Sequence, residues 1–586
     1  MRAVAVSGIV AGSDTRRYGR CVDVWIVAAA VRQVVRWILN LLRRGRRAPD
    51  YVLFTLEGPY PETVPPRGGF LRRRLTKRRP MLTDLCEQLK RVAADGRVSG
   101  VVLRLCALKM SFAELQSLRD LIAELREDGL RVIAWAHGYD TGRYYVACAC
   151  DEVLLQHTGS VGPLGESRRY LFLADALEKV GLKGDFVQIS PYKTAPDMLM
   201  RREMSDEARE MANWLADDLH AQVLDGIASG RGIGADAAAV LVDGSPYPAD
   251  AAVEIGAIDA VVGEEGLPDR LSSGSKPAVI LPFQAARRRL RLPPLRRSGK
   301  YVAVLRIAGD IIDGRSGQPP MRPPFRIPLL FSERAGDLTV IQQARMLAKN
   351  KRAAAIVVHV DSGGGSATSS EAMAAALRRV GAAKPVVVSM SSVAASGGYY
   401  VATPGQRILA QPGTLTGSIG VLSGKLVSEG MLEKLLIRSE AIGRGEHADF
   451  YSAARPFTDD ERQRVWEMIH ETYEVFLGRV ATSRGLSVEA VDAIGGGRVW
   501  TGRQALEHGL VDELGGLARA IDVARELAGL SRRSRVRLIE PSKRDLAPTG
   551  ASPSDAIRYV WDGVAGFNGP AALLLSPLVS WPNELG

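Results

Sequence analysis

Cysteine is scarce in this 586-residue chain, and its pattern excludes a disulfide framework. Only five cysteines occur, all in the first half, and an odd number cannot form a closed set of pairs. Cys148 and Cys150 are separated by one residue, whereas redox and metal motifs usually have two intervening residues and a second cysteine pair. We therefore expect buried thiols, with no metal and no other cofactor.

Motifs for nucleic-acid binding are also missing, although the net charge is +12. There is no zinc-finger spacing and no signature that combines basic with aromatic residues. Arginine runs, such as those at residues 43–47 and 72–74, suit an anionic membrane surface at least as well as nucleic acid. We therefore expect no nucleic-acid partner.

The N-terminal region lacks a clean signal peptide and an uninterrupted apolar span. The apolar segment 22–42 contains Arg32 and Arg36 near its middle, and each would cost about 2.5 kcal/mol or more inside a bilayer. A helix lying in the membrane interface avoids this cost, so residues 1–50 are predicted to be a membrane-associated segment. A true span, with the body facing the cytoplasm, and a packed N-terminal helix remain alternatives.

The overall composition is that of a globular protein. Hydrophobic residues make up 46% and charged residues 24%, which excludes a disordered chain and a multi-span membrane protein. At about 150 residues per domain, the length predicts two to four folded units.

An internal repeat accounts for most of the chain. Five motifs recur in the same order at offsets of 250 to 258 residues, which is hard to obtain by chance. Each copy alternates short apolar strands with helices, which predicts parallel βαβ pairing. The fold class is therefore α/β, with two tandem copies of one domain. The aligned pairs begin at Tyr51 and Tyr301, Val101 and Ile356, Tyr144 and Tyr399, Gly159 and Gly417, and Glu254 and Glu507.

The repeat also predicts the domain boundaries. The first copy spans residues 51–263 and the second 300–530, with a linker at 264–299 and a C-terminal tail at 531–586. The linker is rich in serine, proline and arginine, and holds at most one short strand. The tail from Ala556 onward is apolar but interrupted by prolines, and the sequence assigns it no role.

Two long helices are predicted at corresponding places in the copies. Thr458 opens a capping box, and Ser205 is the corresponding cap in the first copy. The apolar face of the second-copy helix is expected to comprise Val465, Met468, Ile469, Thr472, Val475 and Phe476.

Ser396 stands at a predicted transition from a β-branched strand to a buried helix. The stretch around it, residues 391–400, is rich in small residues and ends in Gly397-Gly398-Tyr399-Tyr400. Backbone N–H groups at such a transition can stabilise an oxyanion. Ser396 does not stand in a Gly-x-Ser-x-Gly elbow, and the repeat singles out no histidine, which argues against a Ser-His-Asp hydrolase.

The two copies differ at the residues that could carry chemistry. Ser396 of the second copy aligns with Thr141, and Gly398 aligns with Arg143. Conversely, Lys193 of the first copy aligns with Glu446 in the second. One copy thus keeps a candidate base and the other a candidate nucleophile.

A serine hydroxyl needs a base to take its proton before it can act as a nucleophile. A lysine amine can be that base only if its pKa falls from about 10.4 toward 7 or 8. Burial of Lys193 in an apolar cleft would cause such a shift. Ser418 is a candidate to orient the amine. Backbone amides at Gly364, Gly365 and Gly397 are candidate oxyanion donors, because glycine lets the backbone approach closely.

These motifs together resemble the signal peptide peptidase A family, also called protease IV, in its long, duplicated form. The resemblance covers roughly residues 51 to 530, and two features depart from it. Gly363 stands where the family usually has proline, and the arginine-bearing N-terminal segment is poorer than the family's transmembrane helix. The motifs that carry the resemblance are Ala394–Tyr399, Thr416–Val421, Tyr192–Ala195, Val499–Ala505 and Gly509–Asp512.

The resemblance implies a fold similar to Clp protease subunits and the crotonase superfamily. It implies a serine endopeptidase with Ser396 as nucleophile, Lys193 as general base and Ser418 as third polar group. It further implies a ring-like homo-oligomer associated with a bacterial-type inner membrane, acting on signal-peptide remnants or other short hydrophobic peptides. Two alternatives remain: a non-catalytic membrane-bound scaffold and an acyl-CoA enzyme of the crotonase-like fold.

Overall fold

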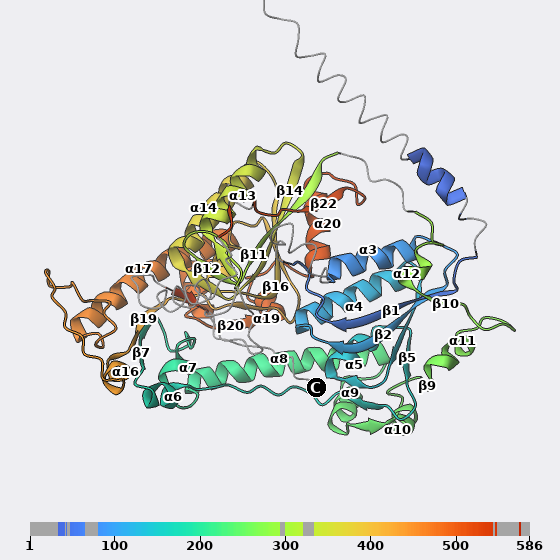
Figure 1. Cartoon of the computed structure of the whole chain (residues 1–586), viewed down its shortest axis with the longest axis horizontal. Coiled ribbons are helices and arrows are strands. Elements are labelled where there is room, and N and C mark those ends of the chain that lie inside the picture. Colours follow the sequence, from blue (N-terminus) through green and yellow to red (C-terminus); the bar gives the residue numbers. More distant parts are fainter. Residues whose placement is uncertain are drawn as a thin grey trace, which may run out of the picture.

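The computed structural model describes residues 33–41, 43, 47–64, 80–292, 299–319, 333–542, 545–547 and 573–575. It contains two parallel sheets, one from each repeat, with helices packed on them (Figure 1). The predicted α/β class and the duplication are both confirmed. Most of the segment 22–42 and most of the C-terminal tail lie outside the described residues.

The first sheet has the strand order β10-β1-β2-β3-β5-β9, and every neighbouring pair is parallel. Helices α3 (Leu82–Ala93), α4 (Phe112–Glu127) and α5 (Thr141–Ala147) bury their apolar residues in one cluster with it. The strands are β1 (Tyr51–Gly58), β2 (Gly100–Leu108), β3 (Arg131–Ala136), β5 (Glu152–Leu155), β9 (Ala260–Val261) and β10 (Ile280–Pro282).

The second sheet repeats this order as β22-β11-β14-β16-β17-β21 with parallel neighbours. Two further strands extend it beside β16: β18 (Leu415–Gly417) is parallel to β16, and β20 (Val499–Thr501) is antiparallel to β18. Helices α13 (Asp337–Lys349), α14 (Ala367–Gly381) and α15 (Gly397–Tyr400) correspond to α3, α4 and α5. The strands are β11 (Tyr301–Ala308), β14 (Ala353–Ser362), β16 (Val386–Ala395), β17 (Arg407–Ala410), β21 (Glu513–Leu514) and β22 (Arg535–Leu538).

The edge strands β10 and β22 come from the stretches predicted as linker and tail. Strand β10 pairs with β1, and the stretch 264–299 also contains the short helices α11 (Leu267–Arg270) and α12 (Phe283–Ala286). Strand β22 pairs with β11 beyond residue 530. Both sheets therefore extend past the predicted ends of their repeats.

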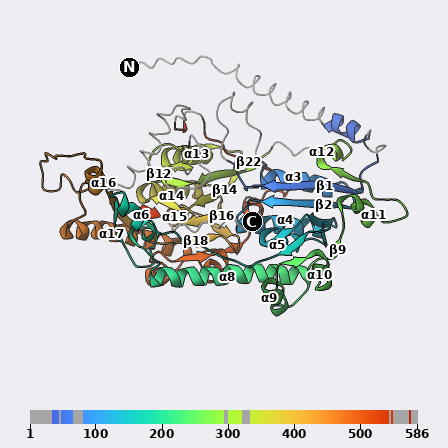
Figure 2. The same ribbon diagram turned by 60° about the horizontal axis from the view of Figure 1, so that its bottom comes forward.

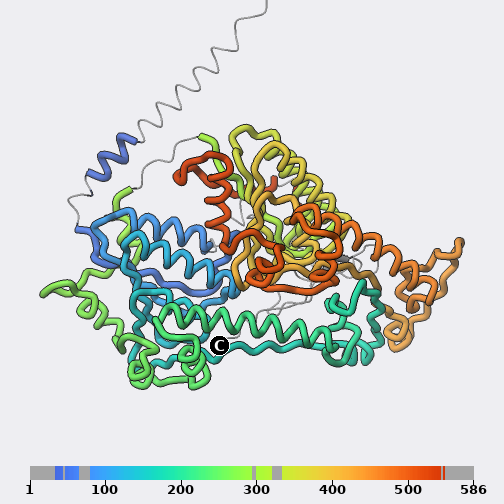
Figure 3. The backbone as a smooth tube through the Cα atoms, turned by 180° about the vertical axis from the view of Figure 1, so that it is seen from behind, coloured from blue at the N-terminus to red at the C-terminus, as the bar shows by residue number. Residues whose placement is uncertain are grey.

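Helix α8 (Asp206–Arg231) joins the two halves physically. It runs beneath both sheets (Figures 1 and 2), although its sequence belongs to the first repeat. The indole ring of Trp214 stacks on Trp500 at a centroid distance of 4.9 Å, and its Nε1 donates to the Val499 carbonyl at 2.9 Å. The view from behind shows the green helix running beneath the orange half (Figure 3).

The repeat-related helix α17 (Asp459–Arg484) begins at the predicted capping box, in which Thr458 and Glu461 bond reciprocally. Ser205 caps α8 as expected. The predicted apolar face of α17 is partly wrong, because Met468 and Val475 are exposed while Tyr473 is buried. This long helix packs only one narrow stripe against the core.

The aligned aspartates Asp259 and Asp512 have a structural role in each repeat. Asp512 accepts a hydrogen bond from the Ile408 amide and pairs with Arg484 of α17 at 2.7 Å. Asp259 does the same with the Val153 amide and with Arg231 of α8 at 2.9 Å. The arginine lowers the pKa of each aspartate.

A third sheet combines strands from both repeats in the order β13-β12-β15-β23-β19-β7. Its first-repeat member is β7 (Lys183–Gln188), which pairs antiparallel with β19 (Leu422–Val427). The remaining strands are β12 (Asp310–Ile312), β13 (Arg334–Gly336), β15 (Gly364–Ser366) and β23 (Leu573–Leu575). No helix within the described residues is long and apolar enough to cross a membrane.

Candidate active site

Strand β7 positions Lys193 beside the second repeat. Its pairing runs from Lys183 with Val427 to Gln188 with Leu422, so the chain leaves β7 next to the loop that holds Ser418. The side chain of Gln188 donates to the Lys193 carbonyl at 2.8 Å, and the Lys193 amide donates to the Ser190 carbonyl at 3.1 Å. A residue of the first repeat is thereby fixed among residues of the second.

The Lys193 amine contacts the two serines that the sequence singles out. Its Nζ atom lies 2.7 Å from Ser396 Oγ, 2.9 Å from Ser418 Oγ and 2.8 Å from the Ser418 carbonyl oxygen. All three residues have 0% exposed surface. The structure thus brings Lys193, Ser396 and Ser418 of a single chain together.

Burial holds the pKa of Lys193 well below its usual range, and no charged group among the described residues opposes this shift. A neutral amine has two N–H donors and one lone pair. The two oxygens of Ser418 accept hydrogen bonds from the two N–H groups of the amine. The nitrogen lone pair is then left to accept a hydrogen bond from the Ser396 hydroxyl. The three contacts therefore match the hydrogen-bonding capacity of a lysine that can accept a proton from Ser396.

The backbone aims Ser396 at this amine. Ser396 follows β16 directly and is the N-cap of α15, with φ 54° and ψ −116°. Its amide donates to the Gly417 carbonyl at 2.8 Å, which ties it to the loop that carries Ser418. A non-glycine residue in such a conformation costs on the order of 1–3 kcal/mol, and such outliers cluster at functional sites.

The candidate oxyanion donors lie next to each other, but they are not equivalent. The Gly364 amide donates to Ser362 Oγ at 3.1 Å, so it is already engaged. A Cβ atom built on Gly397 would lie 3.3 Å from the Gly365 nitrogen and 3.1 Å from the Gly364 Cα atom. Gly365 and Gly397 are therefore better candidates than Gly364. Ser362 holds the turn in which Gly363 replaces proline.

A glycine loop that the sequence did not single out lies against the backbone of Lys193. A Cβ atom built on Gly497 would lie 2.6 Å from the Lys193 Cα atom, and the Gly497 amide donates to the Ile419 carbonyl at 2.7 Å. Ser190 Oγ also donates to the Gly496 carbonyl. The run of three glycines at residues 495–497 was the available signal for a close backbone approach.

The residues that align with Ser396, Gly398 and Lys193 in the opposite copy of the repeat form no comparable cluster. Thr141 is buried at the start of α5 and donates weakly to the Gly165 carbonyl at 3.5 Å, while Arg143 pairs with Asp140. Glu446, which aligns with Lys193, is exposed. The described residues therefore place one serine–lysine pair in the chain, at the meeting of its two copies.

Histidine takes no part in this site. All seven histidines lie among the described residues, and no hydrogen bond joins any of them to Ser396 Oγ within that part of the chain. The buried His359 instead lies 3.7 Å from Glu62, and burial lowers its pKa to about 3.

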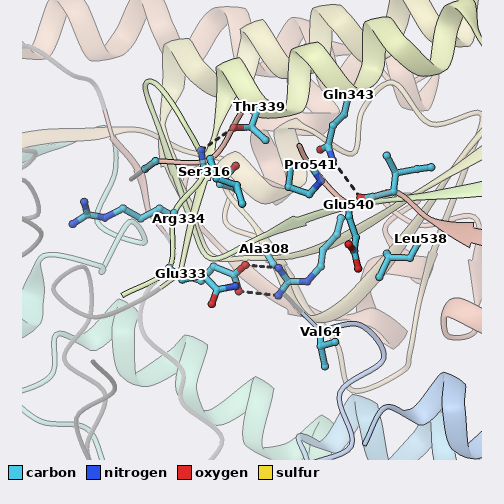
Figure 4. A pocket seen from close by; sticks show the side chains of 17 residues that line it. Val64, Ala308, Ser316, Glu333, Arg334, Thr339, Gln343, Leu538, Glu540 and Pro541 are labelled. Carbon is cyan, nitrogen blue, oxygen red and sulfur yellow. Dashed lines mark hydrogen bonds and ion pairs between the residues drawn. The ribbon is translucent and has the colours of Figure 1, made fainter. Parts of the chain in front are cut away.

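A separate hollow lies between β11, β13 and the end of β22, and none of its lining residues belongs to the serine–lysine cluster (Figure 4). Arg306 and Glu333 pair with each other there, and the Ser316 amide donates to Thr339 Oγ1 at 2.9 Å. These polar groups form hydrogen bonds and ion pairs with each other, so the cluster around Ser396 remains the candidate active site.

The sequence profile of peptidase family S49 matches twice, at residues 124–276 and 378–531, which start 254 residues apart. Protease 4 of Salmonella typhi is 30% identical over 77% of this chain and 72% of its own length. Protease 4 of Haemophilus influenzae is 29% identical over 76% and 72%, and the chloroplastic serine protease SPPA of Arabidopsis thaliana is 29% identical over 79% and 68%.

The Gly497 contact predicts a loss of activity without loss of any polar group. Gly497→Ala would displace the Lys193 backbone, and a displacement of about 1 Å can cost 10²-fold in rate. We expect kcat/KM for a peptide substrate to fall by about that factor. The matched control is Gly485→Ala, which is also at positive φ but has no atom within 4 Å of its added Cβ. Equal activity of the two variants would contradict the proposed support of Lys193.

Proposed function

Because this chain belongs to peptidase family S49, as the two matches over half its length show, we propose that it hydrolyses peptides with a Ser396–Lys193 dyad. The chain is a serine-type peptidase, and the assignment of its catalytic residues is our proposal. The observation that carries it is the 2.7 Å contact between a fully buried lysine amine and a serine hydroxyl. Burial without a counter-charge lowers the pKa of this amine, which is the requirement for a lysine to act as a general base.

In the proposed reaction Ser396 Oγ attacks the scissile carbonyl while its proton passes to Lys193 Nζ. Lys193 then gives that proton to the leaving amine, and water reverses the steps to release the acyl group. Ser418 keeps the amine pointed at Ser396 through both of its oxygens. The Gly365 and Gly397 amides are the proposed donors to the oxyanion, since Gly364 is engaged with Ser362.

We also propose that the enzyme acts at a membrane on short hydrophobic peptides such as signal-peptide remnants. Residues 33–41 are helical, and the side chains of Val34, Trp37 and Leu41 are exposed. Exposed apolar side chains next to the arginine run at 43–47 suit an interfacial helix on anionic lipid. We further propose that the membrane is a bacterial-type inner membrane and that the chain forms a ring-like homo-oligomer. Mass photometry in detergent would measure the number of copies in that oligomer.

The dyad predicts complete dependence on two residues of one chain. Ser396→Ala and Lys193→Met should each lower kcat/KM for peptides by about 10³-fold or more, because nucleophile and base act as one unit. Lys384→Met is the matched control, since this lysine bonds carbonyls at the end of α13 instead of a serine. Mixing the two inactive variants should not restore activity.

An active Lys193→Met enzyme would refute the dyad. Failure of a fluorophosphonate probe to label Ser396 would favour a non-catalytic scaffold. Turnover of acyl-CoA that survives in Ser396→Ala would favour a crotonase-like enzyme.

The lowered pKa of Lys193 predicts the pH dependence of activity. The base is competent only when neutral, so kcat/KM should rise with pH and level off well before the usual lysine range near 10.4. In the unfolded chain this lysine binds a proton that the folded chain does not, so stability also rises with pH there, by about 1.4 kcal/mol per unit. Lys193→Met should therefore gain stability relative to wild type as pH falls. A pH-independent difference in unfolding free energy would contradict this.

The membrane proposal predicts binding to anionic vesicles through the N-terminal segment. The full chain should co-sediment with vesicles that contain phosphatidylserine or phosphatidylglycerol, and removal of residues 1–46 should abolish this. Because arginines bind anionic lipid electrostatically, a higher salt concentration should release an interfacial helix from the vesicles, whereas a membrane-spanning helix would stay bound. Equal sedimentation with and without residues 1–46 would overturn the proposal.

A further inference from the structure

The helix at residues 33–41, here called the N-terminal helix, is fixed against the stretch predicted as linker. The Asn40 side chain bonds the Leu292 backbone twice, since it accepts from the amide at 2.7 Å and donates to the carbonyl at 3.1 Å. Arg43 Nη1 donates to the Leu290 carbonyl at 2.6 Å. The N-terminal helix therefore leaves the folded body at a defined place, next to α12 (Figures 1 and 2).

This arrangement gathers four arginines from three parts of the chain, here called the arginine cluster. Arg36 and Arg43 come from the N-terminal segment, Arg91 lies in the last turn of α3, and Arg287 follows α12. Burial lowers the pKa of Arg91, and the positive charges of the other three arginines lower it further. Positive charges held this close repel one another, and a bound anion would offset the repulsion.

Arg91 has hydrogen-bonding capacity that the described residues do not use. A guanidinium has five N–H donors. Arg91 Nη2 donates to the Arg287 carbonyl at 2.7 Å, whereas Arg91 Nε is buried and has no partner among the described residues. The carboxylate whose charge acts on Arg91 is that of Asp95, and it already binds the Arg97 side chain and the Arg291 amide, each at 2.8 Å. Arg91 is therefore suited to an anion from outside the chain.

We propose that the arginine cluster binds the phosphate group of an anionic lipid where the N-terminal helix meets the folded body. The proposal rests on the proposed membrane association. Arginine matches phosphate well, because its planar fork donates to two oxygens at once. The neighbouring apolar surface favours a lipid as the source of the phosphate, since Val34, Trp37 and Leu41 of the same helix are 56%, 65% and 48% exposed. Lipid headgroups lie at the boundary between hydrocarbon and water, where apolar and basic side chains bind together.

The participation of Arg91 and Arg287 separates this proposal from simple attraction of the N-terminal segment to lipid. Both residues belong to the folded body, far along the sequence from the arginine run at 43–47. An arginine close to an anionic membrane surface contributes about fivefold to affinity. Loss of both should therefore weaken binding to anionic lipid by about 25-fold. Binding to neutral lipid depends on apolar contacts and should not change.

The test measures binding of the full chain to vesicles of phosphatidylglycerol and to vesicles of phosphatidylcholine. Arg91→Gln/Arg287→Gln should lose about 25-fold in affinity for the first and keep wild-type affinity for the second. The matched control is Arg345→Gln/Arg379→Gln, which removes the same charge from exposed positions on α13 and α14 and should bind as wild type does. If circular dichroism shows that the first variant is unfolded, Arg287→Gln replaces it, because this side chain is exposed and its carbonyl is kept. The expected loss is then about fivefold.

Each other outcome overturns a stated part of the proposal. Equal affinity of Arg91→Gln/Arg287→Gln and wild type for phosphatidylglycerol, or an equal loss in the control, would refute the arginine cluster as a site and leave membrane association standing. Failure of wild type to bind these vesicles would refute the membrane proposal itself.

Two competitors test the source of the phosphate. Inorganic phosphate that releases wild type from the vesicles, where chloride at the same ionic strength does not, would assign the arginine cluster to a soluble anion. A short DNA duplex that binds wild type more tightly than the vesicles do, and Arg91→Gln/Arg287→Gln more weakly, would assign it to nucleic acid. Either result would overturn the lipid proposal.

Discussion

The burial of the Lys193 amine without a counter-charge is the constraint on which the site depends. In water this group is an ammonium ion, and moving it into the protein favours the neutral form. A nearby carboxylate would restore the charge and remove the base. The surroundings instead offer two serine hydroxyls and a carbonyl, which bond the neutral amine fully. Within the part of the chain that the structure describes, the absence of charge around Lys193 is thus as important as the contacts that it makes.

Duplication explains how such a site can be assembled. Each repeat has its own sheet, and each sheet is closed at one edge by a strand from beyond its predicted boundary. The first repeat also sends β7 and α8 across to the second, where β7 pairs with β19 and Trp214 stacks on Trp500. Lys193 follows β7 in the sequence, so the pairing of β7 with β19 also places the lysine at the second repeat. Loss of the serine from one copy and of the lysine from the other therefore leaves one shared site instead of two.

The sequence predicted the fold well, and it singled out candidate residues, because duplication provides an internal comparison. Ser396 and Lys193 stood out since their aligned positions, Thr141 and Glu446, lack the same chemistry. Helix caps were predictable because they depend on local spacing, as at Thr458.

Contacts between distant segments were not predictable. Nothing local shows that Gly497 must lie against Lys193, or that residues 573–575 pair with Gly364 and Gly365. The buried side of α17 was partly missed for the same reason, since its periodicity does not say how wide a stripe the core covers. Engagement of the Gly364 amide by Ser362 likewise depends on turn geometry that composition does not specify.

The separation of 203 residues between Lys193 and Ser396 affects the protein while it is being made. Ribosomes add about 5–20 residues per second, so roughly 10–40 s pass between the synthesis of the proposed base and that of the proposed nucleophile. Strand β19, which anchors the lysine-bearing strand β7, follows later still. A nascent chain therefore carries no activated serine until most of it has left the ribosome. With the two residues of the proposed dyad in different copies, proteolytic activity would not appear until the protein is nearly complete.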